Sequence, residues 1–188
     1  MRSHSPRGGS TPDGDEARAP LTFGLADPGS PDAQSVLSRF FTDIVARRRG
    51  RPPTPAELAR VMLDEPSSDL RGATGFLVVV RDGAQVVGCG GVRIVEPGVG
   101  ELTRIFVDPV ARGRRGGHAL LRELEATGAH RGLHLLRLTV RDDLVEARRL
   151  YESAGYRPVA PFSDSPYADH FLAKALGSPP QESGAHRG

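Results

Sequence analysis

The sequence is poor in cysteine and in lysine. Cys89 is the only cysteine among 188 residues, so an internal disulfide and a cysteine-based metal site are excluded. Its apolar surroundings predict a small buried residue. Lys174 is the only lysine, so nearly all positive charge comes from arginine, and the formal net charge is only +2. No basic run is interleaved with aromatic side chains, so we expect no nucleic-acid partner.

Long hydrophobic runs are also absent. No apolar stretch reaches the roughly 18 residues of a membrane span, and the N-terminus lacks the apolar region of a secretory signal. The six histidines show no spacing typical of metal ligands, so we expect no bound metal. Together these absences predict a cytoplasmic protein without a membrane partner.

Both ends of the chain carry few apolar side chains. Residues 1–20 and 177–188 are dominated by small, polar and proline residues and cannot bury enough surface to become ordered. We therefore expect two disordered tails around a single folded domain over residues 21–176. A chain of 188 residues is long enough for one such domain.

Local patterns predict a mixed α/β fold. Alternating apolar residues and turn signals predict strands over 21–26, 75–80, 85–95, 100–107, 133–140, 156–160 and 170–176. Helical spacing and capping signals predict helices over 31–45, 55–62, 117–128 and 143–155, the last with Asp143 and Glu146 as its N-terminal capping pair. Because hairpins come first and β-α-β units later, we expect a mixed sheet with helices on both faces.

The segment GELTRIFVDPVARGRRGGHALL, residues 100–121, carries the clearest chemical signal. A strand leads through an Arg- and Gly-rich loop into a helix, an arrangement that binds an anionic diphosphate through backbone N–H groups. Arginines 112, 114 and 115 add positive charge. This segment therefore predicts a phosphate-bearing cofactor, unless the glycines only form a turn and the arginines are solvated. The chain lacks G-x-x-x-x-G-K-[ST] and an intact G-x-G-x-x-G in this loop, which argues against a nucleotide-binding protein.

Two motifs together resemble the GNAT N-acetyltransferase superfamily over residues 21–176. RGRRGG at 112–117 is similar to the family's acetyl-CoA loop, Q/R-x-x-G-x-G/A, and EARRLYESAGY at 146–156 is similar to its E-A-x-x-L-Y-x-x-x-G-F/Y helix. DSPYADH at 164–170 resembles a branch that is sometimes fused to bacterial MarR-type regulators. Arg115 stands where the family usually has glycine. Either Arg115 adopts a strained positive φ, or Gly116 takes over that conformation.

The resemblance implies a GNAT-like fold that binds acetyl-CoA. The expected sheet is mixed and mostly antiparallel, has six to seven strands, and splays into a V between the central parallel strands at 100–107 and 133–140. Acetyl-CoA would lie in that V. The residues expected to bind it are Ile105, Phe106, Val107, Arg112, Gly113, Arg114, Arg115, Gly116, Gly117 and His118.

The resemblance also implies a proton donor, and the chemistry and position of other residues indicate candidates for the base and the acceptor site. Tyr151, on the inward stripe of its helix, would donate a proton to the departing thiolate of coenzyme A. The alternative for Tyr151 is a core tyrosine. Glu101 would take a proton from the amine, directly or through water, or is only a strand-end charge or a partner for Arg104. The expected substrate-binding residues are Arg104, which would hold a substrate carboxylate, Tyr167 and His170.

The predicted reaction is transfer of an acetyl group from acetyl-CoA to a primary amine of a small molecule or peptide. The amine would attack directly, because no serine or cysteine nucleophile is paired with a base. The alternative is a non-catalytic module that binds or senses acyl-CoA. The resemblance is compatible with a homodimer, and it leaves the amine acceptor open.

Overall fold

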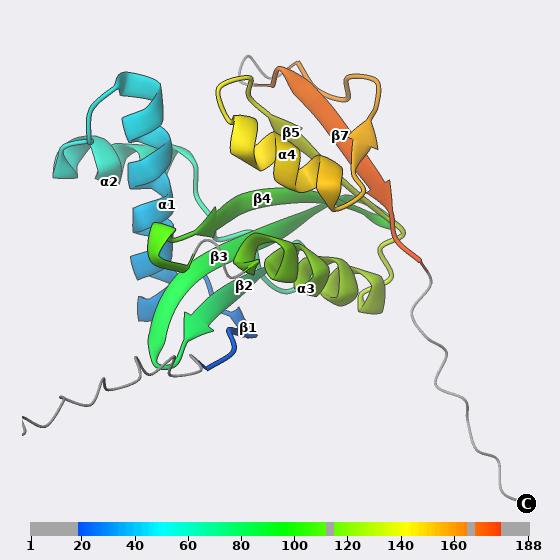
Figure 1. Ribbon diagram of the computed structural model, residues 1–188, viewed down its shortest axis with the longest axis horizontal. Helices are drawn as coiled ribbons and strands as arrows, with labels where there is room; N and C mark the ends of the chain where they lie inside the picture. Colours follow the sequence, from blue (N-terminus) through cyan, green and yellow to red (C-terminus); the bar gives the residue numbers. More distant parts are fainter. Residues whose placement is uncertain (1–18, 112–114, 165–167, 178–188) are drawn as a thin grey trace, which may run out of the picture.

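A computed structural model describes residues 19–111, 115–164 and 168–177 of the chain (Figure 1). The strands are β1 (Thr22–Ala26), β2 (Gly75–Asp82), β3 (Gln85–Glu96), β4 (Val99–Val107), β5 (Leu135–Val140), β6 (Arg157–Pro158) and β7 (His170–Ala175). The helices are α1 (Pro31–Arg49), α2 (Pro55–Asp64), α3 (Gly116–His130) and α4 (Val145–Ser153), with a short 3-10 helix η1 (Pro109–Ala111) after β4. The predicted order of strands and helices is confirmed.

The described strands form one seven-stranded sheet in the order β1-β2-β3-β4-β5-β7-β6. Neighbouring strands are antiparallel, except that β4 and β5 run parallel. A parallel pair needs a long crossover, and α3 supplies it. The expected mixed, mostly antiparallel sheet is therefore confirmed.

The two parallel strands pair only at their beginnings. Their register contains three residue pairs, and the last of them joins Glu101 to Arg137. Beyond this pair β4 continues to Val107 and β5 to Val140 without further pairing between them. Figure 1 shows the two strands close together at their starts and separating toward their ends. This is the V-shaped splay that the family resemblance implied.

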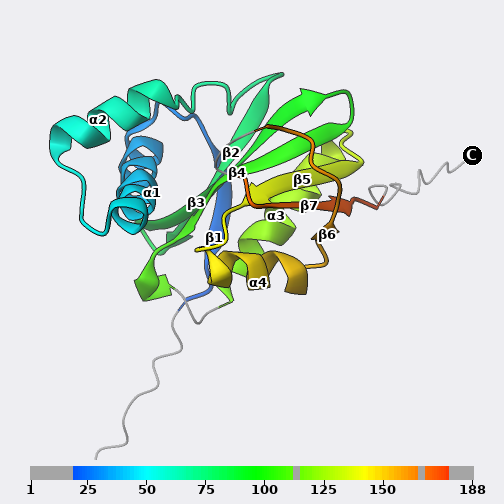
Figure 2. The same cartoon turned by 90° about the horizontal axis from the view of Figure 1, so that it is seen from above.

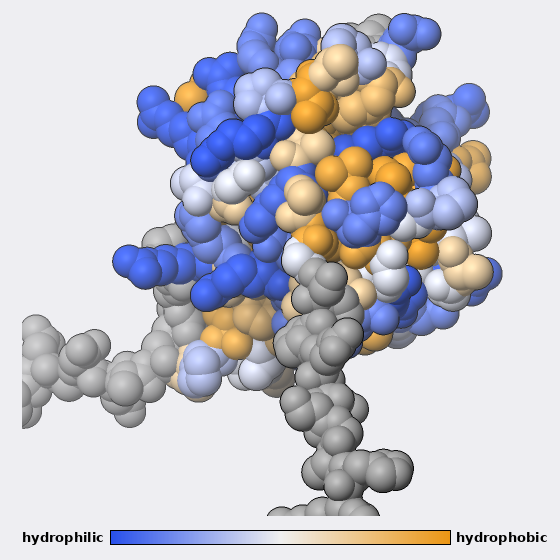
Figure 3. Space-filling view, turned by 90° about the vertical axis from the view of Figure 1, so that its right-hand side faces the viewer, coloured by the Kyte–Doolittle hydropathy of each residue, from blue (hydrophilic) through white to orange (hydrophobic). Residues whose placement is uncertain are grey.

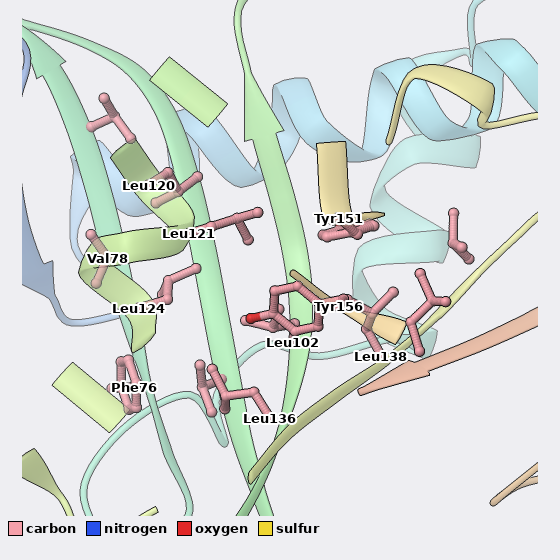
Figure 4. Packing of buried hydrophobic residues seen from close by; sticks show 14 of the residues in the cluster. Phe76, Val78, Leu102, Leu120, Leu121, Leu124, Leu136, Leu138, Tyr151 and Tyr156 are labelled. Atoms are coloured by element: carbon pink, nitrogen blue, oxygen red, sulfur yellow. The ribbon is translucent and has the colours of Figure 1, made fainter. Parts of the chain in front are cut away.

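Helices cover both faces of the sheet. In Figure 2, α1 and α2 lie on one face, and α3 and α4 lie on the other. The larger core cluster lies under α3 and α4 and includes Leu120, Leu124 and Tyr156 (Figure 4). A smaller cluster under α1 includes Leu37 and Cys89, which is fully buried as predicted. The helical periodicity of the sequence thus identified the faces that form the core.

Local capping signals explain two of the helix starts. Ser30 caps α1, with its side chain accepting a hydrogen bond from the Ala33 backbone N–H at 3.4 Å. Thr54 and Glu57 form the predicted capping box of α2. For α4 the prediction was wrong, because Leu144 occupies the cap position without a side-chain hydrogen bond.

Asp143, the expected cap of α4, is engaged elsewhere. Its carboxylate accepts two hydrogen bonds of 2.8 Å from the Arg141 guanidinium. The final hairpin also differs from expectation, since β6 contains only Arg157 and Pro158 instead of the predicted strand over 156–160. Proline lacks a backbone N–H, so it limits how far this edge strand can pair.

The disordered tails and the homodimer, both expected from the sequence, stay predictions. Most of the two predicted tails, residues 1–18 and 178–188, lies outside the described residues.

Figure 3 shows one face on which hydrophobic residues gather in a central group among hydrophilic ones. The large, well-exposed apolar side chains among the described residues come from different segments: Leu25, Leu63, Val145 and Val159. A homodimer stays a prediction.

Candidate active site

One pocket lies between β4 and the helices α1, α3 and α4. Its volume is about 440 Å³. Residues 105–107 of β4, residues 115–118 at the start of α3, and Tyr151 of α4 form part of its wall. The fold therefore gathers the described residues of the expected cofactor set and the expected proton donor around one space. Glu101, Arg104 and His170 do not line it.

Strand β4 carries a bulge where it borders the pocket. Gly90 of β3 faces two residues of β4, Arg104 and Ile105, so the pairing shifts by one residue. The φ angle of Arg104 is +56°, in the left-handed region that non-glycine residues rarely adopt. A bulge disrupts the ladder locally and leaves its extra residue unpaired. The splay also removes β5 as a partner for this part of β4.

The side chain of Arg104 is directed away from the pocket. Its guanidinium donates to the Glu65 carbonyl oxygen at 2.9 Å and to the Ser67 hydroxyl at 3.2 Å. It lies 4.7 Å from the centroid of the Phe41 ring and is only 9% exposed. Burial lowers the pKa of Arg104, and the nearby Glu65 carboxylate opposes that shift. The guanidinium of Arg104 is thus engaged by residues of its own chain. This arrangement leaves it no free face for the carboxylate of a substrate, the role expected from the sequence.

Helix α3 begins at the pocket with an unusual residue. Arg115 takes the cap position at φ +55° and makes no side-chain cap hydrogen bond within the described chain. Of the two alternatives expected from the sequence, Arg115 itself therefore adopts the strained conformation. The first backbone N–H groups of any α-helix lack intrahelical partners and carry partial positive charge. The amides of Gly116, Gly117 and His118 thus lie at the positive end of the helix, beside the pocket.

Gly117 allows α3 to approach α4 closely. A Cβ atom at this position would lie 3.0 Å from a terminal methyl group of Leu150. His118 spans the same two helices, with its Nε2 atom 2.9 Å from the Ser153 hydroxyl. The remaining loop residues of the expected cofactor set, Arg112, Gly113 and Arg114, lie outside the described residues.

Tyr151 is both a core residue and a pocket residue. It belongs to the larger hydrophobic cluster, is 7% exposed, and packs edge-to-face on Tyr156 with ring centroids 5.9 Å apart. Within the described chain its phenol has no hydrogen-bond partner, and it borders the pocket. Burial raises the pKa of Tyr151 above its ordinary value of about 10. The phenol is therefore protonated at neutral pH.

Glu101 lies where β4 and β5 begin to separate. Its carboxylate accepts a hydrogen bond of 3.4 Å from Arg137, its partner in the strand register. Neighbouring Leu102 is in the core under α3, so strand alternation places Glu101 on the opposite face. The structure thus pairs Glu101 with Arg137, in place of the Arg104 partner considered from the sequence.

The expected acceptor residues are only partly described. Tyr167 lies outside the described residues. His170 begins β7, and its Nε2 atom is 2.5 Å from Asp142 Oδ1 and 2.9 Å from a guanidinium nitrogen of Arg148. These contacts join β7 to the loop before α4 and to α4 itself. His170 therefore acts as a link between segments in this structure.

The pocket also includes residues to which the sequence analysis gave no role in the site. Asp43 and Arg47 project from α1, and Glu146 projects from the first turn of α4. The Arg47 guanidinium is 2.9 Å from Asp43 and 3.9 Å from Glu146, so this ion-pair group spans the two helices. The sequence signal that could have indicated this ion pair is the i,i+4 spacing of Asp43 and Arg47 on one helix. Nothing in the sequence indicated that α1 would approach α4.

Two searches of the described residues gave negative results. No group of three or more His, Cys, Asp or Glu side chains there is arranged to hold a metal ion. No described helix combines the length and apolar character needed to cross a membrane.

Known proteins provide an independent comparison. The model of the acetyltransferase (GNAT) family matches residues 39–156. An IAA acetyltransferase from Azospirillum brasilense is 38% identical over 107 residues, which are 55% of this chain and 67% of that relative. The match therefore spans about two thirds of the relative's length.

Solved structures share the fold along most of the chain. A Klebsiella pneumoniae protein assigned as an acyl-CoA N-acyltransferase superimposes with a TM-score of 0.63 at 26% identity, over 84% of this chain and 98% of that one. An aminoglycoside 6'-N-acetyltransferase in complex with coenzyme A gives a TM-score of 0.61 at 19% identity, over 85% and 99% of the two chains. The family match, the splayed sheet and the pocket beside the bulge all indicate the same family. The chain belongs to the acetyltransferase (GNAT) family, whose members are acyltransferases that use acetyl-CoA.

Proposed function

We propose that this protein is an N-acetyltransferase that moves the acetyl group of acetyl-CoA to a primary amine by direct attack. The observation that carries the proposal is the convergence of three features on one pocket. These are the helix α3 N-terminus, the bulged backbone of β4, and the buried phenol of Tyr151.

The start of α3 would hold the diphosphate of acetyl-CoA. Three consecutive amides, from Gly116 to His118, lie at the positive end of the helix. The exposed Arg115 beside them adds a positive charge near the same pocket. Backbone amides preserve this preference for an anion even where a single side chain is changed.

The unpaired edge of β4 would hold the pantetheine arm. Beyond Glu101 this strand has no β5 partner among the described residues, so its N–H and C=O groups can bond to the amides of an extended ligand. At the bulge, a backbone N–H near Ile105 would face the thioester carbonyl. A donor fixed at a developing negative charge supplies about 3 kcal/mol of transition-state stabilisation.

Tyr151 would complete the chemistry. The amine nitrogen forms a bond to the thioester carbon, the carbon–sulfur bond breaks, and the phenol protonates the leaving thiolate. The phenol is protonated at neutral pH, and after the transfer it would regain its proton from solvent. The amine must lose a proton to attack, and Glu101 is the proposed acceptor, either directly or through water. Arg137 would hold its carboxylate at the apex of the splay.

A binding experiment and a turnover experiment test the proposal. Calorimetry should show that acetyl-CoA binds, whereas ATP and NAD at the same concentration should not. A panel of primary amines should then release the free thiol of coenzyme A in the presence of the protein. Absence of acetyl-CoA binding at millimolar concentration would contradict the proposal. Binding without turnover across the panel would favour the acyl-CoA-sensing alternative.

A further inference from the structure

We propose that Arg104 is a positioning residue, whose side chain holds the β4 bulge in the shape that acetyl transfer requires. The proposal rests on the proposed function, because the shape of the bulge affects catalysis only if a thioester lies against β4. Arg104 would not touch the ligand. It would act through the backbone of its neighbour Ile105, which lines the pocket.

The backbone of Arg104 adopts a conformation that is rare for a residue other than glycine. Two described non-glycine residues have a positive φ: Arg104 at +56°, next to the pocket residue Ile105, and Arg115 at +55°, which lines the pocket. A non-glycine residue in this region raises the free energy of the folded chain and persists only when its surroundings hold it there. In a bulge, glycine would meet the same requirement without strain. The arginine side chain must therefore contribute something that glycine lacks.

The side chain contributes an anchor with several hydrogen bonds. Nη2 of Arg104 donates to the Glu65 carbonyl oxygen at 2.9 Å, Nε to the Ser67 hydroxyl at 3.2 Å, and Nη1 to the Glu65 carboxylate at 3.4 Å. All three guanidinium nitrogens are thus bonded to the segment that follows α2. The planar guanidinium fixes the direction of these bonds relative to one another, which a lysine ammonium cannot do.

Stacking on α1 limits the remaining freedom of the side chain. The guanidinium carbon lies 4.7 Å from the ring centroid of Phe41 and 5.6 Å from that of Phe40. With 9% exposure, the side chain has little solvent-filled space in which to rotate. Arg104 therefore joins α1 and the segment after α2 to the bulge. All of these contacts lie on the sheet face opposite α3 and α4.

The anchor and the reacting groups are on different residues, so they can be changed separately. Glu65 and Ser67 do not line the pocket, and no catalytic role is assigned to them. Replacing both with alanine weakens the anchor and leaves Arg104 in place. Arg104→Gly removes the anchor and keeps a positive φ accessible. Arg104→Lys keeps the charge and loses the planar fork.

A spectroscopic readout reports the bulge without requiring a known amine. The infrared carbonyl band of [1-13C]acetyl-CoA moves to lower frequency when a fixed donor polarises the thioester. We expect this shift in the wild-type complex. It should fall by more than half in Arg104→Gly. It should fall by less in the Glu65→Ala/Ser67→Ala variant, which keeps the bond to the backbone carbonyl of residue 65 and the stacking on α1, and Arg104→Lys should retain only part of the shift. The dissociation constant of acetyl-CoA should stay within about threefold, because the α3 amides are unchanged.

The matched control is Arg81→Gln. Arg81 also links the sheet to α1, through an ion pair with Asp32, but it lies on β2 away from the bulge. Its carbonyl band should equal that of the wild type. If Arg104→Gly is folded and gives a wild-type band, the positioning role is overturned and the proposed function stands. If the wild type itself gives no bound band, both fail. A bound but unshifted band in the wild type overturns the positioning role alone.

Once an amine is identified, steady-state kinetics give a second readout. Arg104→Gly should lower kcat about tenfold with little change in the KM for acetyl-CoA, because small displacements of a transition-state donor affect the chemical step most strongly. Equal losses in Arg104→Gly and Arg81→Gln would indicate a general structural effect and overturn the proposal.

Discussion

The thiol of Cys89 donates a hydrogen bond to the backbone carbonyl oxygen of Arg104, with a sulfur–oxygen distance of 3.3 Å. The bond connects the buried centre of β3 to the bulge of β4. It satisfies the carbonyl of a residue whose backbone is strained. The single cysteine of the chain is therefore part of the scaffold beneath the pocket.

Cys89 should resist thiol reagents in the native protein. Its side chain is fully buried, and burial raises the pKa of the thiol to about 12, so almost no thiolate forms at pH 8. Labelling by a disulfide reagent at pH 8 should be complete only after urea unfolding. Rapid stoichiometric labelling of the folded protein would contradict this placement.

Replacing Arg115 with glycine should stabilise the protein. At φ +55° arginine is strained by about 1 kcal/mol, which glycine avoids. Arg115→Gly should therefore exceed Arg115→Ala in free energy of unfolding by about that amount, as measured by urea titration. Both variants lack the guanidinium, so their difference isolates the backbone. Equal stabilities would mean that residue 115 does not require a positive φ.

Tyr151→Phe should lower kcat and leave acetyl-CoA binding nearly unchanged. A positioned proton donor typically contributes about a hundredfold or more to rate, and the phenylalanine ring preserves the packing. Tyr156→Phe is the matched control, because Tyr156 is also buried, lies beside Tyr151, and does not line the pocket. Its kcat should equal that of the wild type. Similar losses in both variants would assign the effect to packing.

Stability should decrease at alkaline pH. Burial raises the pKa of both Tyr151 and Tyr156 above the ordinary value, and the negative charge of Glu125 adds to the shift at Tyr156. Their buried neutral forms support folding fully below pH 10. Above that pH the unfolded chain loses these protons first, so the free energy of unfolding falls by up to about 1.4 kcal/mol per pH unit for each tyrosine.

Urea titrations from pH 8 to 11 measure this alkaline decline. Tyr156→Phe should show a shallower decline than the wild type, since it lacks one of the two titrating groups. An identical slope in the two proteins would show that Tyr156 does not contribute.

Glycines of β3 should differ in their tolerance of alanine. A Cβ atom at Gly88 would lie 2.6 Å from the backbone oxygen of Phe106, which cannot rotate away. At Gly90 the nearest contacts are terminal methyl groups of Leu124 and Ile105, which can adjust. We expect Gly88→Ala to cost about 2 kcal/mol or more of stability, and Gly90→Ala less. Gly24→Ala, with nothing within 4 Å, is the control.

Much of the fold followed from local patterns. The apolar stripe of α1, the capping box at Thr54, and the hairpin turn after Asp82 each depend on neighbours within a few residues. Such signals predict where an element begins and ends. The parallel pairing of β4 and β5 also followed, because a helix lies between them in the sequence.

One part that escaped prediction depends on distant contacts, and another depends on competition between two residues that are close in the sequence. The Arg104 side chain is held by Glu65 and Ser67, more than thirty residues earlier in the chain, so its direction was not visible in the strand pattern. The cap of α4 was missed because Arg141 engages Asp143. In both cases an arginine forms hydrogen bonds that the helix and strand patterns of the sequence do not predict.

The short register between β4 and β5 has a mechanical consequence. The sheet consists of a four-stranded half and a three-stranded half, joined through three residue pairs. A ligand lying along this seam would bond to both halves and act as an additional partial strand. Occupancy should therefore couple the two halves, slow hydrogen exchange on both sides of the seam, and make their unfolding more cooperative.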